Sequence, residues 1–227
     1  MSAGNILIIN NHGVLSDLEY AKKYDPTNPA GLHDTRTGTF EFMAIEVANG
    51  GYLFHPVLSD GQSPQPFRHN PLHDLESVWW VATWSMVSHS PEAGGYSVTK
   101  HRDQYTSMFP KIYDATSRAL FIVLKRHFLR AVSDGFPPVF KNALKELEAM
   151  RELLLQWYDV AYQPFELQQK ADTRVFDRAY DQVVEFIKSA WAHLAEDTKF
   201  ITLQEALRRL PKGAAQTSTT QDRTGSR

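Results

Sequence analysis

The stretch GNILIINNHGVLSDLE, residues 4–19, places a polar turn between two short apolar runs. The apolar runs consist of Ile, Leu and Val, and the four residues between them, Asn10 to Gly13, have the composition of a tight turn. Apolar, β-branched runs joined by Asn and Gly are typical of a two-stranded hairpin. The stretch therefore predicts a β-hairpin over residues 6–16.

Downstream of the hairpin, the sequence changes from an irregular connection to a series of helices. Pro and Gly recur between residues 19 and 73 and little is periodic there, which predicts a long irregular connection of the kind that is usually functional or disordered. Residues 73–88, HDLESVWWVATWSMVS, are apolar almost all round from Val78 onward, as in a helix buried inside a domain. Further helices are predicted over residues 117–132, 138–158, 175–194 and 203–210, and residues 89–116 are predicted to be loop-rich.

The fold class that these patterns predict is mainly α, with a short N-terminal β-hairpin, a long connecting segment and a helical body. Residues 1–211 are predicted to form one domain. The last stretch, KGAAQTSTTQDRTGSR (residues 212–227), is small, polar and free of aromatic side chains. Such a segment buries too little apolar surface to fold, so it is predicted to be a disordered tail.

The composition is that of a soluble globular protein and excludes several functional classes. The chain has 227 residues, 42% of them hydrophobic, and a formal net charge of -2 without a long basic stripe, which argues against a nucleic-acid binder. Without cysteine there is no disulfide and no thiolate zinc site. No apolar stretch reaches the roughly 18 uncharged residues of a membrane span, and the N-terminus lacks signal-peptide features. We therefore expect an intracellular protein, in the cytoplasm or nucleus, that binds neither nucleic acid nor membrane.

Two oxygen-bearing side chains flank the predicted hairpin. Asn5 directly precedes its first strand and Asp17 follows its second, so the hairpin brings them to the same end of the ribbon. Amide and carboxylate oxygens are the hard ligands that Mg²⁺ prefers. Asn and Asp also flank hairpins for reasons of turn geometry alone. The spacing by itself therefore leaves both a metal site and a purely structural role open.

Four segments in a fixed order give this pair a context: SAGNILI, GVLSDLEYA, RTGTFEFMAIE and HDLESVWWV, which begin at residues 2, 13, 36 and 73. Together they resemble the fungal-type protein kinase family. The resemblance is close over residues 2–84 and extends to the helical remainder in layout only. It implies a protein-kinase-like C-lobe with a long activation-type segment, with ATP and Mg²⁺ as cofactors and a protein as substrate or partner.

The resemblance implies a role for individual residues near the nucleotide and the substrate. Asn5 matches the catalytic-loop Asn that holds one Mg²⁺, and Asp17 matches the Asp that bridges metal to the β- and γ-phosphates. Thr39 matches the residue of the substrate-docking loop that hydrogen-bonds the catalytic Asp in Ser/Thr kinases. These three residues are the metal and docking candidates of the chain.

Further matches are structural. Ala44, Ile45 and Glu46 stand where the kinase pattern has Ala-Pro-Glu, and the resemblance implies that this Glu pairs with an Arg in the late helices. Asp74 matches the Asp at the start of the central helix that orients the catalytic-loop backbone. A helix dipole alone also favours an acidic residue at that position.

By the same resemblance, the chain begins inside a catalytic loop, whose last four residues match residues 2–5. The catalytic-base Asp, the Gly-rich loop, the phosphate-gripping Lys and its Glu partner are then expected upstream of Met1. No residue of this chain is therefore assigned as the catalytic base. His101-Arg102-Asp103 spells the tripeptide that begins such a loop, but it follows the central helix and is interpreted as surface loop.

Two functional hypotheses from different classes follow. The first is a partial fungal-type protein kinase domain, whose family activity is ATP-dependent phosphorylation of Ser or Thr in proteins, with this chain alone predicted to be inactive. The alternative is a non-catalytic, pseudokinase-like helical module that binds a partner. A generic helical protein with an incidental hairpin is a third reading, but it has to produce four ordered motifs by chance.

Overall fold

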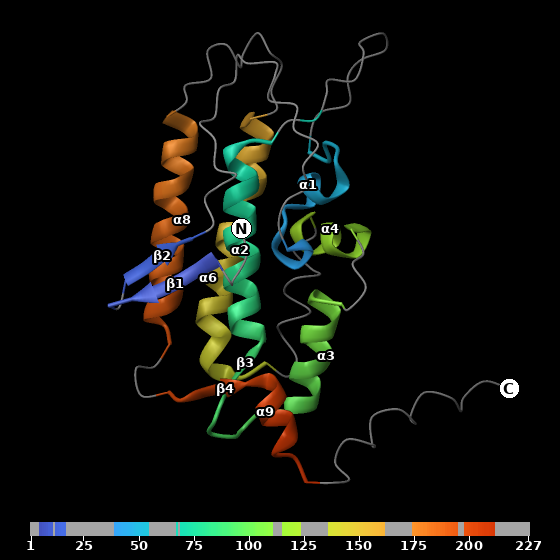
Figure 1. Cartoon of the computed structure of the whole chain (residues 1–227), viewed down its shortest axis with the longest axis vertical. Coiled ribbons are helices and arrows are strands. Elements are labelled where there is room, and N and C mark those ends of the chain that lie inside the picture. The colour runs from blue at the N-terminus through green and yellow to red at the C-terminus, as the bar shows by residue number, and fades with distance from the viewer. Residues whose placement is uncertain are drawn as a thin grey trace, which may run out of the picture.

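A computed structural model describes residues 5–10, 12–16, 39–54, 67, 69–110, 115–123, 136–161, 174–194 and 198–211. This part of the chain is mainly helical, with two small antiparallel sheets (Figure 1). The helices are α1 (Ile45–Asn49), α2 (Pro71–Val87), α3 (Val98–Met108), α4 (Ala115–Val123), α6 (Lys141–Ala161), α8 (Arg174–Ala192) and α9 (Leu203–Arg208), with 3-10 turns η3 (Phe40–Phe42) and η4 (Pro138–Phe140). The strands are β1 (Ile6–Ile9), β2 (His12–Leu15), β3 (His89–Pro91) and β4 (Phe200–Thr202). The mainly α class is confirmed, and the predicted tail lies outside the described residues.

The predicted N-terminal hairpin is confirmed. Strands β1 and β2 pair antiparallel, with Ile6 opposite Leu15 and Ile9 opposite His12. Asn10 adopts a positive φ of 51°, which Asn tolerates and which the tight turn of a hairpin requires. The described aliphatic side chains of the ribbon are exposed, and Ile9 keeps 52% of its accessible surface. A two-stranded ribbon of this kind is marginal by itself, so it depends on what covers it.

Helix α2 is the centre of the helical body (Figure 1). Asn70 caps its first turn: its side chain accepts the Leu72 N–H, and Pro71 occupies the first helical position. Trp79 and Trp80 are completely buried, as the continuous apolar pattern predicted. Helices α6 and α8 pack against α2 and against each other, and α3 and α1 also contact α2.

The predicted helices α6 and α8 are confirmed, and α6 buries its predicted face, whereas Tyr180, Val184 and Trp191 of the apolar pattern in α8 are exposed. In α6, the buried face includes Leu147, Leu154 and Tyr158, together with Arg151, which is 1% exposed. The Arg151 guanidinium is held by two hydrogen bonds, at 2.8 and 2.9 Å, from its nitrogens to the two carboxylate oxygens of Glu148. A buried charge is tolerated when it is paired and hydrogen-bonded in this way.

The prediction of a loop over residues 89–116 was wrong in two places. Helix α3 occupies residues 98–108, with Ser97 as its cap, and β3 pairs with β4 so that His89 lies opposite Thr202. This sheet joins the end of α2 to the segment before α9. Thr202 also starts α9 as the capping pattern predicted, because its side-chain oxygen accepts the Glu205 N–H at 3.2 Å. Among the described residues, no helix combines the length and the apolar character that crossing a membrane requires.

Candidate functional site

The base of the hairpin holds Asn5 next to the residue that precedes Asp17. Ser16 donates twice to the Asn5 carbonyl oxygen, from its backbone N–H at 2.8 Å and from its hydroxyl at 3.1 Å. Asn5 itself is half-buried. Asp17 lies outside the described residues, so its predicted place beside Asn5 stays a prediction, supported by the closed hairpin end.

The donor set at this end suits Mg²⁺ in its chemistry. An amide oxygen and a carboxylate are hard ligands, and Mg²⁺ keeps several waters or phosphate oxygens in its octahedral shell, so two protein ligands suffice. Within the described part of the chain, no group of three His, Asp or Glu side chains is arranged to hold a metal. The predicted site pairs Asn5 with Asp17, which lies outside this described part.

Thr39 lies at the exposed start of η3. Its carbonyl accepts the Phe42 N–H at 2.9 Å, and its side chain forms no cap hydrogen bond to the turn. Thr39, Phe40 and Glu41 are exposed, whereas the chain from Phe42 to Glu46 is buried. The segment thus presents three side chains outward and anchors itself through the residues that follow them.

Ala44, Ile45 and Glu46 are buried at the start of α1, and Glu46 is the anchor of this region. One of its carboxylate oxygens accepts the backbone N–H groups of Leu53 and Phe54 at 2.6 and 2.9 Å, and the other lies 2.9 Å from His73 Nε2. Helix α1 ends at Gly50, whose left-handed conformation has a φ of 67°. The chain turns there, between Glu46 and the amides of Leu53 and Phe54. Glu46 therefore stabilises both the helix start and the chain that returns from it.

Among the described residues, Glu46 is hydrogen-bonded to a histidine from α2, and its pairing with an arginine from the late helices, which the resemblance implied, stays a prediction. His73 Nδ1 accepts the backbone N–H of Asn70 at 3.0 Å, so the ring proton is carried by Nε2 and donated to Glu46. Arg151, the buried arginine of α6, binds Glu148 and the Ile122 carbonyl. His73 can donate to Glu46 from Nε2 because its Nδ1 accepts the Asn70 N–H in the cap of α2.

Glu76 is a second buried carboxylate that sequence reasoning missed. Its oxygens accept the Ile45 N–H at 2.8 Å, the Trp80 indole N–H at 3.1 Å and the Tyr158 hydroxyl at 2.8 Å. Burial raises the pKa of Glu76, and these three hydrogen bonds oppose that shift. The signal was available: a Glu inside an apolar helix has to be satisfied by several donors.

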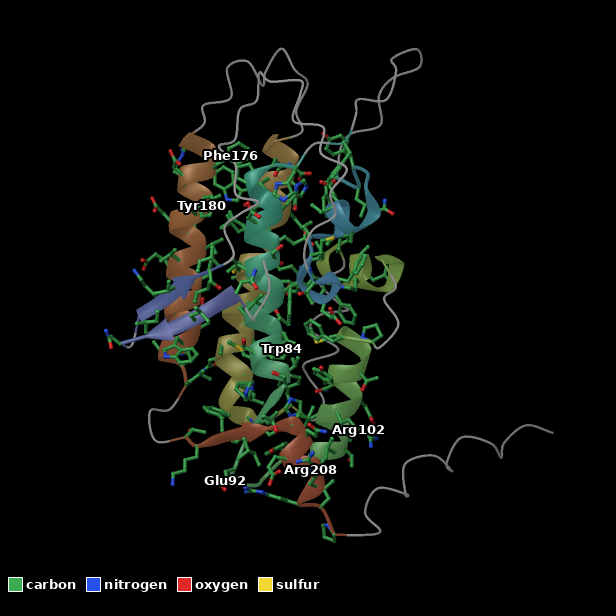
Figure 2. All side chains as sticks on the ribbon, viewed as in Figure 1. Trp84, Glu92, Arg102, Phe176, Tyr180 and Arg208 are labelled. Atoms are coloured by element: carbon green, nitrogen blue, oxygen red, sulfur yellow. The ribbon has the colours of Figure 1, made fainter. Side chains whose placement is uncertain are left out.

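Asp74 lies in the first turn of α2, where both sequence interpretations placed it. Its carboxylate is half-exposed and lies 3.8 Å from His69 Nε2. Burial and the nearby negative charge of Asp74 raise the pKa of Tyr180, which α8 presents at this end of the molecule (Figure 2). Residues 2–4, which belong to the catalytic loop that Asp74 is predicted to orient, lie outside the described residues.

The His101-Arg102-Asp103 tripeptide is helical and not a surface loop. It forms part of α3, and Figure 2 shows Arg102 on that helix. Arg102 and Asp103 form a surface ion pair at 2.8 Å, while His101 is fully buried with Nδ1 3.0 Å from the Ser90 hydroxyl. The histidine therefore has a packing role that links α3 to β3.

Acid should destabilise the protein through His101. Burial lowers its pKa to about 4, against an opposing hydrogen bond to the Val87 backbone, while the unfolded chain binds the proton near the ordinary value of 6.5. The stabilising contribution is thus complete above that value and is lost as the pH falls toward the folded-state pKa. Between pH 7.5 and pH 5, the free energy of unfolding measured in urea should fall by about 2 kcal/mol less in His101→Gln than in the unchanged chain. Equal pH dependence of the two proteins would contradict this assignment.

The comparison with known families agrees with the four motifs. A model of the fungal protein kinase family matches residues 1–86. The matched residues include Asn5, Asp17, Thr39, Glu46 and Asp74, and the match ends within α2, so the helices that follow lie outside it. No curated protein and no solved structure matches the chain at a significant level. The resemblance read from the motifs is therefore confirmed over the first part of the sequence.

Proposed function

We propose, from the family match over residues 1–86, that the chain carries the metal-binding and substrate-docking half of a fungal-type protein kinase domain. The family activity is transfer of the γ-phosphate of ATP to a Ser or Thr hydroxyl of a protein. The single observation that carries the proposal is the match itself, which spans the hairpin, residues 39–45 (the docking segment) and all but the last residue of α2. The closed hairpin end and the buried anchor at Glu46 support it.

In this proposal the residues of the chain hold and orient, and none of them takes the substrate proton. Asn5 and Asp17 would bind Mg²⁺, which neutralises charge on the transferring phosphates. Ser16 keeps the Asn5 backbone at the hairpin end. Thr39 would face the catalytic loop, and Glu46 would fix the docking segment onto α2. Because the catalytic base and the phosphate-gripping Lys are not among these residues, the 227-residue chain alone is proposed to be inactive in phosphate transfer.

A binding role is the second candidate, and the exposure of the hairpin favours it. Leu7, Ile9, Val14 and Leu15 are each at least 40% exposed on a ribbon of two short strands. Exposed apolar side chains gathered on one element mark a surface that another protein covers. A non-catalytic lobe that docks a protein partner would use such a surface without ATP.

Metal binding and phosphate transfer separate these candidates. We expect Mn²⁺, as a paramagnetic substitute for Mg²⁺, to broaden the amide resonances of Asn5 and Ser16 in the purified chain, and Asp17→Ala to abolish the broadening. Asp103→Ala, which removes an exposed carboxylate of α3, is the matched control and should leave it unchanged. Radiolabelled ATP should give no phosphate transfer above the Asp17→Ala background. Transfer that Asp17→Ala abolishes would overturn the proposed inactivity, and absence of Mn²⁺ broadening would favour the binding role.

A further inference from the structure

The docking segment, residues 39–45, is fixed at both ends by buried side chains from two different helices. At its start, Arg118 of α4 donates from Nη1 to the Phe40 carbonyl oxygen at 2.6 Å. At its end, Glu76 of α2 accepts the Ile45 N–H at 2.8 Å. The backbone of the segment is therefore bonded to the core at Phe40, directly beside its exposed side chains, and again at Ile45.

The two fixing groups meet on one aromatic ring. The guanidinium carbon of Arg118 lies 3.8 Å from the centre of the Trp80 ring, and the indole N–H of Trp80 donates to Glu76 at 3.1 Å. A carboxylate that accepts from the indole N–H increases electron density on the ring, and a richer ring attracts a cation more strongly. The cation, ring and carboxylate are thus coupled electrostatically, although Arg118 and Glu76 lie on separate helices.

All three members of this arrangement are buried, so each charged group depends on the other members for compensation. Arg118 is 2% exposed, and Trp80 and Glu76 are completely buried. A buried guanidinium or carboxylate is costly unless it is compensated, so removing one member leaves the others undercompensated. An arrangement of this kind has one favourable geometry, and this geometry fixes the positions of both ends of the docking segment.

We propose that Arg118, Trp80 and Glu76 form a clamp that positions the docking segment, so that a change at either charged end releases the whole segment while the helical body stays folded. The inference rests on the proposed function for its biological meaning, because that function makes residues 39–45 the part that meets a protein substrate. All three clamp members are positioning residues. They act through the backbone of Phe40 and Ile45.

Hydrogen exchange of the full chain tests the release. In Arg118→Met and in Glu76→Gln, amides of the docking segment should exchange at least about tenfold faster, while peptides from α6 and α8 change less than about twofold. Arg102→Met is the matched control, because it removes a half-exposed surface arginine of α3, and it should change neither region. Arg118→Lys and Trp80→Phe give the same comparison with milder changes where the first two variants fold poorly.

A spectroscopic readout tests the coupling itself. The indole N–H resonance of Trp80, identified by its loss in Trp80→Phe, should shift in Glu76→Gln and also in Arg118→Met, although Arg118 lies over the ring face and not at the N–H. Arg118→Lys should restore part of the shift because it returns the positive charge.

Three results would overturn the clamp: an unmoved resonance in Arg118→Met, unchanged exchange of the docking segment, or equally faster exchange in every helix. Neither readout uses a metal or a nucleotide. Failure of the Mn²⁺ test would therefore contradict the kinase interpretation of the segment, while the hydrogen-exchange and resonance measurements would still test the clamp.

Discussion

Replacing Glu46 with alanine is expected to reduce the free energy of unfolding by about 3–5 kcal/mol. The carboxylate is completely buried and accepts hydrogen bonds from Leu53, Phe54 and His73. Alanine would leave the buried His73 N–H and the part-buried amides of Leu53 and Phe54 without this acceptor, and each buried unpaired group costs about 1–3 kcal/mol. Urea denaturation followed by circular dichroism measures the change.

Two variants make the Glu46 result specific. Glu46→Gln keeps the shape and one accepting oxygen, so we expect a loss roughly half as large. Glu41→Ala removes an exposed carboxylate five residues earlier and should change stability by less than about 0.5 kcal/mol. A loss below about 1 kcal/mol in Glu46→Ala would show that the carboxylate is not the anchor described here.

Trp79→Ala should be comparably damaging, with a loss of about 3–5 kcal/mol in the free energy of unfolding. The Trp79 side chain is completely buried on α2, and its indole N–H donates to the Leu147 carbonyl of α6 at 2.7 Å. The substitution removes a large apolar volume and leaves a carbonyl without that donor. Thermal or urea unfolding followed by circular dichroism, and not by tryptophan fluorescence, gives the comparison.

Trp191 provides the matched control for Trp79. It is a tryptophan of α8 that is 72% exposed, so Trp191→Ala should change the unfolding free energy by less than about 0.5 kcal/mol. Equal losses for the two tryptophans would contradict the placement of α2 at the centre of the fold. Trp79→Phe, which keeps most of the volume without the N–H, should fall between them.

The elements that could be predicted from the sequence are those whose pattern is dictated by burial. The hairpin follows from a turn between two apolar runs, and α2 follows from an apolar run too long for a strand. Helices α6 and α8 each bury one face, so their apolar residues recur every three to four positions. Even Arg151 fits the face of α6, because its charge is satisfied beside it by Glu148.

Helix α3 and the β3–β4 sheet gave no such signal. The buried residues of α3 are His101 and Met108, so its apolar period is weak and a histidine occupies a core position. Strand β3 is His-Ser-Pro, and three residues are too few to show alternation, while Pro argues against a strand. Both elements form because tertiary contacts outweigh local preference.

In the candidate site, the sequence identified residue types but not all of their partners. Glu46 was predicted to be a structural anchor, and its burial agrees with that role, but pairing with His73 depends on how α1 meets α2. The Arg118 contact with Trp80 joins residues 38 positions apart on separate helices. No local pattern encodes such a contact, because it arises only after the helices have packed. The metal role of Asn5 and Asp17 stays a prediction.

The β3–β4 sheet has a consequence for the order in which the protein can be built during translation. Strand β3 ends at Pro91 and its partner begins at Phe200, so about 110 residues are synthesised between them, which takes about 5–20 s on a ribosome. During that interval the end of α2 emerges before the strand that seals it. Until β4 arrives, the backbone groups of β3 that pair with β4 in the folded protein lack these partners.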